Sequence, residues 1–151
     1  MDGKLIIYVD MDFTLCDFKK SYDQVLQSNP EIKYPQSVPG FFRGLEPIPD
    51  AINTYRWLNK QERFSVFILT APSIKNPLCY TEKRLWVEDH LGIKAVDGLI
   101  ISPHKGLNKG DYLIDDNVQG KGQEFFEGHL IEFGSTHYPD WVSIKQFFDK
   151  L

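Results

Sequence analysis

The chain is organised around one stretch, Ile6-Ile7-Tyr8-Val9-Asp10-Met11-Asp12-Phe13-Thr14-Leu15. Its run of apolar residues is typical of a strand buried on both faces, as in the parallel sheets of α/β proteins. Ligands bind such sheets at the carboxyl ends of the strands, which is where Asp10 and Asp12 stand. Two neighbouring carboxylates repel each other, and a hard cation such as Mg²⁺, which prefers oxygen ligands, relieves that repulsion. The simpler alternative is a strand that ends in a turn favouring Asp.

Composition limits the classes of protein that fit this stretch. The 151 residues suffice for one domain with a sizeable core, and 42% hydrophobic with 25% charged residues is typical of a globular protein. A net charge of −4 argues against an extended nucleic-acid-binding face, which is usually basic, but permits a small phosphorylated ligand bound by local cations. Two cysteines without zinc spacing, no signal peptide and no apolar run of membrane-spanning length predict a cytoplasmic location.

Apolar runs and helical repeats alternate along the rest of the chain. Further strands are predicted at 64–70, 98–102, 111–117 and 128–133, and helices at 18–27, 47–62, 80–92 and 141–151. This alternation predicts an α/β fold with a doubly wound, mostly parallel, Rossmann-like sheet. The turn-rich residues at about 17–45, directly after the first strand, predict a short cap insertion over the site.

Two of the other predicted strands also end in polar residues. The strand at 64–70 ends in Thr70, and the apolar run beginning at 111 ends in the pair Asp115–Asp116. A threonine here also fits plain β-propensity. The acidic pair repeats the pattern of the first strand, so we expect it to supply another metal carboxylate.

These motifs resemble a known family. The D-x-D-x-T of residues 10–14 resembles the first motif of the haloacid dehalogenase superfamily of phosphotransferases. The string D-M-D-F-T-L-C-D-F at 10–18 is similar to the D-M-D-G-V-L-A-D-F pattern of its 5′(3′)-deoxyribonucleotidase branch, with Phe13 replacing the usual Gly. T-A-P at 70–72 is similar to that branch's T-S-P, and residues 82–88 to its E-K-x-x-W-V-E. The resemblance implies a single haloacid-dehalogenase-like domain over 1–151 with a reduced cap.

The resemblance also implies a reaction. It implies a Mg²⁺-dependent phosphomonoester hydrolase in which Asp10 attacks phosphorus and forms an aspartyl-phosphate. Asp12 would act as general acid and then as general base. The metal would be held by the side chains of Asp10 and Asp116 and by the backbone carbonyl of Asp12. Asp115 would not bind the metal itself but would orient its ligands.

Phosphate binding is assigned by the same resemblance. It implies that Thr70, the Ala71 N–H and Lys105 hold the phosphate oxygens, with Lys109 as the alternative lysine. Lys83, in the first turn of the helix at 80–92, is expected in solvent; contact with the phosphate is the alternative.

The substrate is predicted to be a nucleoside monophosphate. Phe18, together with Phe41 or Phe42, would line a slot for the base, with Arg43 nearby. Aromatic residues of this kind also serve simply to pack a loop onto a domain. Much of the aromatic-rich cap of the family is missing from this chain, which leaves open a homodimer whose second subunit completes the pocket.

Alternatives to this interpretation remain at this point. The substrate could be another small phosphate monoester or a phosphorylated nucleic-acid end. From a different class, a receiver-like phosphoacceptor or a non-catalytic phosphate-binding module also gathers Asp, Thr and Lys around Mg²⁺. Asp12 separates these classes, because a receiver needs no acid two residues after its phosphorylated aspartate.

Overall fold

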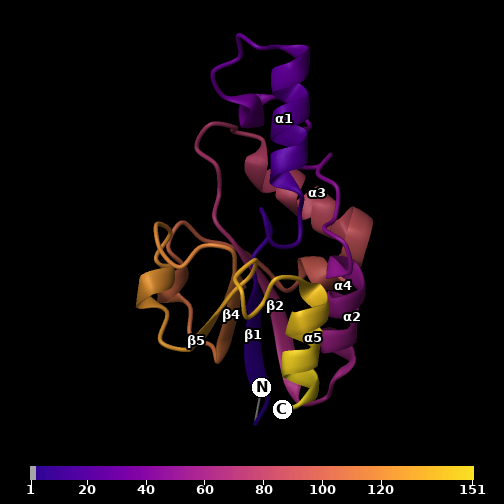
Figure 1. Ribbon diagram of the computed structural model, residues 1–151, viewed down its shortest axis with the longest axis vertical. Coiled ribbons are helices and arrows are strands. Elements are labelled where there is room, and N and C mark those ends of the chain that lie inside the picture. The colour runs from indigo at the N-terminus through magenta and orange to yellow at the C-terminus, as the bar shows by residue number, and fades with distance from the viewer. Residues whose placement is uncertain (1–2) are drawn as a thin grey trace.

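The computed structural model describes residues 3–151 and has a sheet of five parallel strands at its centre (Figure 1). The strands lie in the order β3-β2-β1-β4-β5. Their bounds are β1 Leu5–Val9, β2 Phe64–Thr70, β3 Leu99–Ile101, β4 Tyr112–Asp115 and β5 His129–Glu132. The prediction of an α/β fold with a parallel, Rossmann-like sheet is therefore confirmed.

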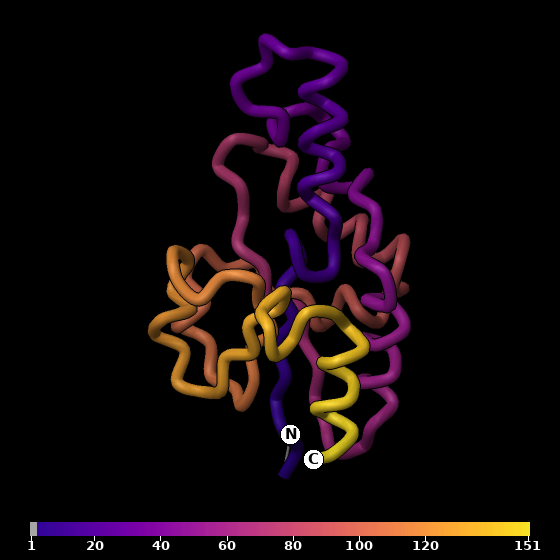
Figure 2. Tube along the Cα trace, in the orientation of Figure 1, coloured from indigo at the N-terminus to yellow at the C-terminus, as the bar shows by residue number. Residues whose placement is uncertain are grey.

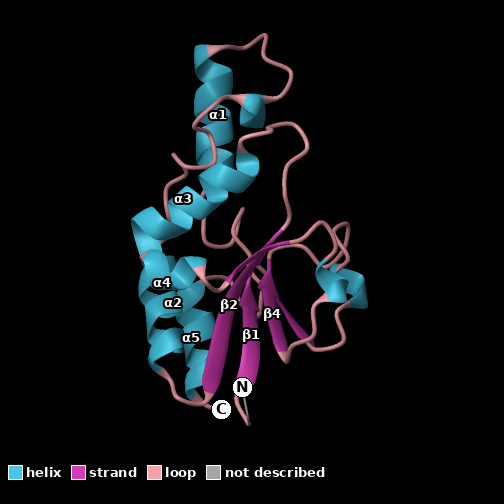
Figure 3. Cartoon of the chain, turned by 180° about the vertical axis from the view of Figure 1, so that it is seen from behind, coloured by secondary structure: helices cyan, strands magenta, loops and turns pink. Residues whose placement is uncertain are grey.

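The helices that follow the cap gather on one face of the sheet (Figure 3). They are α2 (Ala51–Lys60), α3 (Cys79–Leu91), the short α4 (Ile93–Val96) and α5 (Trp141–Asp149). Side chains alternate along a strand, so Ile7 and Val9 point to this side and join its core. Trp86 of α3 and Trp141 of α5 are fully buried in the same core.

Within residues 3–151, no α-helix covers the second face of the sheet (Figure 3). Tyr8 packs there in an edge-to-face contact with Phe126, beside the 3₁₀ helices η2 (Lys105–Leu107) and η3 (Gln123–Phe125). These elements belong to the connections at 102–111 and 116–128. Gly128 shows how closely they pack, because a Cβ built on it would lie 2.4 Å from a backbone oxygen.

A cap stands beyond the carboxyl ends of the strands (Figure 1). It contains α1 (Phe18–Ser28) and the 3₁₀ helix η1 (Pro35–Ser37). Trp86 Nε1 donates a 2.8 Å hydrogen bond to the Leu45 carbonyl and so fixes the end of the cap to α3. Figure 2 shows the segment after β2 rising to the cap, where Asn76 Nδ2 donates to the backbone oxygen of Gln36 at 3.0 Å.

Helix bounds and buried faces differ in part from the sequence predictions. The helix predicted at 47–62 extends only from Ala51 to Lys60. The helix predicted at 80–92 begins at Cys79, and its buried face carries Glu82, Lys83, Trp86 and Val87. Because this face includes two charged residues, an apolar pattern could not reveal it. Among residues 3–151, no helix combines the length and the apolar character needed to cross a membrane.

Candidate active site

Three carboxylates meet where β1 and β4 lie side by side. Asp10 follows β1, Asp115 ends β4, and Asp116 comes next in the chain. Oxygen atoms of the three side chains lie within 4.8 Å of one another, which is a spacing that one metal ion can bridge. The cluster sits at the switch point of the sheet, because the chain continues from β1 to one side and places β4 on the other.

One lysine lies among these acids. Lys105, only 2% exposed, donates a 2.7 Å hydrogen bond from Nζ to Asp10 Oδ1 and a second one to Asp115 Oδ2. Burial alone would lower the pKa of Lys105, but the charges of Asp10 and Asp115 outweigh burial and raise it. The lysine is therefore a fixed cation, and η2 holds it at the centre of the site.

The two acids at the end of β4 have different surroundings. Asp115 is fully buried and accepts hydrogen bonds from Lys105, from Gln123 Nε2 at 3.3 Å and from the Asn117 N–H at 2.9 Å. Asp116 is more exposed and accepts from Thr14 Oγ1 at 3.3 Å, and Thr14 also donates to Asp10. Asp115 thus has the contacts of a supporting residue, whereas Asp116 is freer to bind a ligand.

The cluster carries more negative charge than Lys105 can neutralise. Burial, followed by the charge of Asp10, raises the pKa of Asp116 to about 8 and that of Asp115 to about 6. Oxygen donors crowded in this way fit a hard divalent cation, whose charge would favour the ionised form of each carboxylate.

This charge imbalance predicts a pH-dependent stability in metal-free protein. Carboxyl groups with raised pKa stabilise the fold at low pH, and that contribution is lost as pH rises through about 6 and then about 8. We expect the melting temperature in EDTA to fall by about 5 °C between pH 5.5 and 8.5, and Mg²⁺ to reverse the loss at pH 8.5. Calorimetry on the wild type and on Asp116→Asn tests this, because the variant should show a flatter profile. An identical profile in the variant would contradict the assignment.

A tight turn carries Asp12 away from the cluster. The Met11 carbonyl accepts from the backbone N–H groups of Thr14, Leu15 and Cys16 at 2.8 to 3.0 Å. Trp141 Nε1 of α5 donates to the Thr14 carbonyl at 2.8 Å and anchors the turn to that helix. The turn is thus fixed by bonds within it and by a helix far along the chain.

Asp12 pairs with a lysine for which the sequence prediction was wrong. Lys83, expected in solvent, is 1% exposed and donates from Nζ to Asp12 Oδ2 at 3.0 Å, to Thr70 Oγ1 and to the Ala71 carbonyl. Burial raises the pKa of Asp12, although Lys83 opposes the shift. Asp12 Oδ1 is buried and has no hydrogen-bond partner among residues 3–151, which suits a carboxyl group that exchanges a proton with a ligand.

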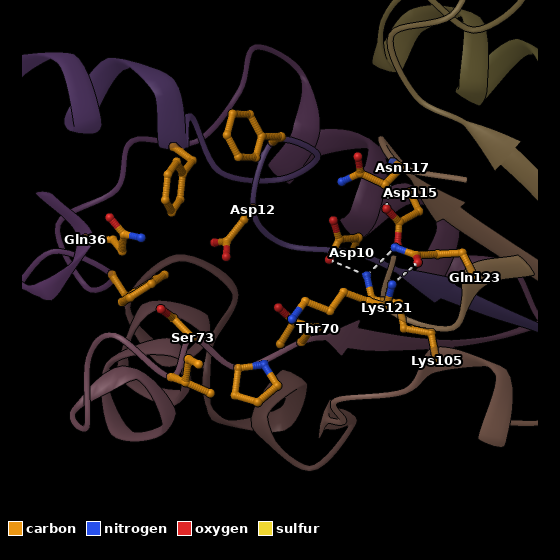
Figure 4. Close-up of a pocket in the computed structure, with 16 residues that line it drawn as sticks. Asp10, Asp12, Gln36, Thr70, Ser73, Lys105, Asp115, Asn117, Lys121 and Gln123 are labelled. Atoms are coloured by element: carbon orange, nitrogen blue, oxygen red, sulfur yellow. Dashed lines mark hydrogen bonds and ion pairs between the residues drawn. The ribbon is translucent and has the colours of Figure 1, made fainter. Parts of the chain in front are cut away.

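The two acids of the first motif open into one cavity of about 300 Å³ (Figure 4). Figure 4 shows Asp12 set apart from the cluster that Asp10, Lys105 and Asp115 form. The lining comes from both sides of the site and from the cap; it consists of Asp10, Asp12, Phe13, Phe18, Gln36, Phe42, Thr70, Ala71, Pro72, Ser73, Ile74, Lys105, Asp115, Asn117, Lys121 and Gln123.

Two predicted base-binding residues do not line this cavity. Arg43 forms an ion pair with Asp89 on the outside of α3, at 2.9 Å from Nε to Oδ2. Phe41 is buried against Phe18 and Phe42, and it is Phe42 that lines the cavity. The expectation of Arg43 and Phe41 in the substrate site is corrected accordingly.

Several residues in or beside the cavity were not predicted from the sequence to belong to the site. Gln36 and Phe13 carried no signal, because a glutamine in a turn and a loop aromatic are common. Lys83 had one signal, since it lies three positions before Trp86 and therefore on the same helical face. Gln123 orients Asp115 from η3, in a segment for which no role was predicted.

A family model described as "5' nucleotidase, deoxy (Pyrimidine), cytosolic type C protein" matches residues 32–140. A protein of Vibrio phage KVP40 named "Putative 5'(3')-deoxyribonucleotidase" is 40% identical over 147 residues, covering 95% of this chain and 84% of the phage protein.

Cellular relatives match over a shorter range. The human "5'(3')-deoxyribonucleotidase, cytosolic type" is 45% identical over 86 residues, which are 57% of this chain and 43% of the human protein. A "Putative 5'(3')-deoxyribonucleotidase" of Bordetella bronchiseptica is 44% identical over 80 residues, 53% of this chain and 42% of that protein. The matched part is thus less than half of each of these two relatives.

Proposed function

Since the chain belongs to the 5′ nucleotidase, deoxy (pyrimidine), cytosolic type C family, we propose that it is a phosphatase that hydrolyses deoxyribonucleoside monophosphates. The relatives named above are called deoxyribonucleotidases, which supports this choice of substrate. Family membership also favours a hydrolase over a receiver-like phosphoacceptor module.

One observation carries the proposal: the two acids of the first motif have separate partners. Asp10 is held by Lys105 within the carboxylate cluster, whereas Asp12 contacts Lys83 and keeps one buried oxygen without a partner in the described part of the chain. Both line the same cavity. Separate partners let one acid stay ionised as the nucleophile while the other carries a proton for the leaving group of the same phosphate.

The reaction follows in two displacements. A carboxylate oxygen of Asp10 attacks phosphorus, the bond from phosphorus to the nucleoside oxygen breaks, and Asp12 gives its proton to that leaving oxygen. Water then attacks the phosphorus of the aspartyl-phosphate while Asp12 takes up a proton, which releases inorganic phosphate and restores Asp10. The raised pKa of Asp12, caused by burial, favours the protonated form that the first displacement requires.

Thr70 and Ala71, which line the cavity, and Lys83, which lies behind them, can hold the phosphate. Lys83 Nζ, the Thr70 hydroxyl and the backbone at Ala71 form a connected set beside Asp12. Lys83 therefore joins Thr70 and Ala71 as a phosphate-binding residue, while Lys105 positions the nucleophile. Cations placed where charge develops favour the transition state.

The acidic cluster is the candidate magnesium site. Asp10 and Asp116 would bind Mg²⁺, with Asp115 orienting the arrangement from its own hydrogen bonds. Bound there, the ion would neutralise phosphate charge and reduce its repulsion of the Asp10 carboxylate. The donor set fits, since it consists of oxygens only.

Phosphate release from a panel of esters tests the proposal. The panel contains deoxy- and ribonucleoside monophosphates with 5′ or 3′ phosphate, a sugar phosphate and a 3′-phosphorylated oligonucleotide, each with Mg²⁺ or EDTA. We expect metal-dependent turnover with at least about tenfold higher kcat/KM for deoxyribonucleotides than for the sugar phosphate. Turnover of the oligonucleotide alone would instead support the alternative of a nucleic-acid end, and turnover in EDTA would contradict the metal requirement.

A further inference from the structure

Phe13 has a backbone conformation that an aromatic residue rarely adopts. Its φ is +64°, in the left-handed region that favours glycine. Its ring is also 43% exposed, so burial of the ring does not compensate for the strained backbone. A strained residue that exposes a large apolar side chain beside Asp12 suggests a role in binding.

The ring of Phe13 ends a short stack of aromatic side chains. It stacks on the ring of Phe18, with centroids 4.8 Å apart and planes inclined at 29°. Phe18 in turn stacks on Tyr22 at 6.0 Å and 25°, whereas Phe41 meets Phe18 edge-on at 69°. Phe13 and Phe18 line the cavity, so the stack ends there on an exposed ring against which a further flat ring can pack.

A polar group of the cap enters the same cavity. Gln36 lies across the cavity from Asp10 and Lys105, with Asp12 between them (Figure 4). Its backbone is tied to Asn76, but its buried Oε1 has no hydrogen-bond partner within residues 3–151. A carboxamide offers donors and an acceptor, so it can satisfy adjacent polar groups on the edge of a heterocycle.

We propose that Phe13 and Gln36 bind the base of the substrate, Phe13 by stacking on its face and Gln36 by hydrogen bonding to its edge. The inference rests on the proposed function and adds to it the residues that select a base-bearing ester over a plain sugar phosphate. It also explains how a chain with a short cap can bind a base, because the turn after β1 adds the ring of Phe13 to the aromatic side chains that the cap supplies.

Two substrates isolate the contribution of the base. One is a pyrimidine deoxyribonucleoside 5′-monophosphate and the other is 2-deoxyribose 5-phosphate, the same ester without its base. We expect Phe13→Ala to raise KM for the nucleotide about tenfold, since base stacking contributes at this level, and to leave kinetics with the sugar phosphate within about twofold. Gln36→Ala should raise KM for the nucleotide about fivefold. In both variants kcat should change little, because the base contact persists from ground state to transition state.

Two further variants separate the effect of losing the aromatic ring from the effect of the strained backbone. Phe13→Tyr keeps a stacking face and should retain the wild-type KM for the nucleotide. Phe13→Gly removes the ring but relieves the backbone, so it should lose affinity like Phe13→Ala while melting at a higher temperature than that variant.

The outcomes distinguish the two proposals. Wild-type KM for the nucleotide in both Phe13→Ala and Gln36→Ala overturns the base-binding role and leaves the proposed function in place. An equal rise in KM for both esters in Phe13→Ala also overturns it, because that result would mean that Phe13 only supports the turn. Failure of the wild type to hydrolyse either ester overturns the proposed function itself.

Discussion

Asp10→Asn is expected to lower kcat for nucleotide hydrolysis by about 10⁴-fold or more, as the loss of a nucleophile does in other enzymes with covalent intermediates. The amide has nearly the same shape as the carboxylate, and its oxygen can still accept the hydrogen bond from Lys105. What it lacks is the anionic oxygen that attacks phosphorus. Steady-state phosphate release with saturating Mg²⁺ measures the loss.

Asp97→Asn is the matched control for this variant. Asp97 is an exposed aspartate between α4 and β3, and its substitution makes the same change in net charge away from the cavity. It should retain wild-type kcat. Retention of a tenth or more of the activity by Asp10→Asn would contradict the covalent mechanism, provided that the variant is folded.

Lys105→Met is expected to affect stability as well as activity. The change leaves Asp10 and Asp115 without the buried cation that bonds to both, and breaking a buried ion pair in this way costs about 3–5 kcal/mol. The cost should be largest above pH 8 and smaller near pH 5. The pKa values of Asp115 and Asp116 are raised to about 6 and about 8, so both carboxyl groups are largely protonated near pH 5. Protonation at that pH relieves the repulsion among the acids of the cluster. We expect kcat to fall at least about 10²-fold.

Lys109→Met provides the comparison, because Lys109 is exposed four residues further along the same segment. Urea unfolding of both variants at pH 5 and pH 8.5, in EDTA, gives the four free energies required. A loss of stability in Lys105→Met that is the same at both pH values would show that the lysine matters for packing rather than for charge.

The sequence predicted the parts of the site that follow strand ends. Asp10 and the Asp115–Asp116 pair come directly after apolar runs, and parallel strands bring their carboxyl ends to one edge, so their meeting follows from the pattern alone. Lys105 was expected only from the resemblance to the 5′(3′)-deoxyribonucleotidase branch. The meeting of the acids, by contrast, depends on contacts that the backbone of the sheet dictates.

The parts that could not be predicted depend on how the helices and the cap pack over that edge. Lys83 looks like a solvent-facing lysine until Trp86 shows which face of α3 is buried. Arg43 looked like a ligand of the substrate, but Asp89, 46 residues away, pairs with it on the surface. Such partners are set by tertiary contacts, which hydrophobic periodicity does not encode.

The hydrogen bond from Trp141 to Thr14 also sets an order of events during synthesis. The indole that anchors the first-motif turn is 127 positions later in the chain than the carbonyl it binds. A ribosome makes about 5–20 residues each second, so β1 is made well before α5. The nascent chain therefore carries Asp10 and Asp12 on a turn without this anchor until α5 has been made and docks.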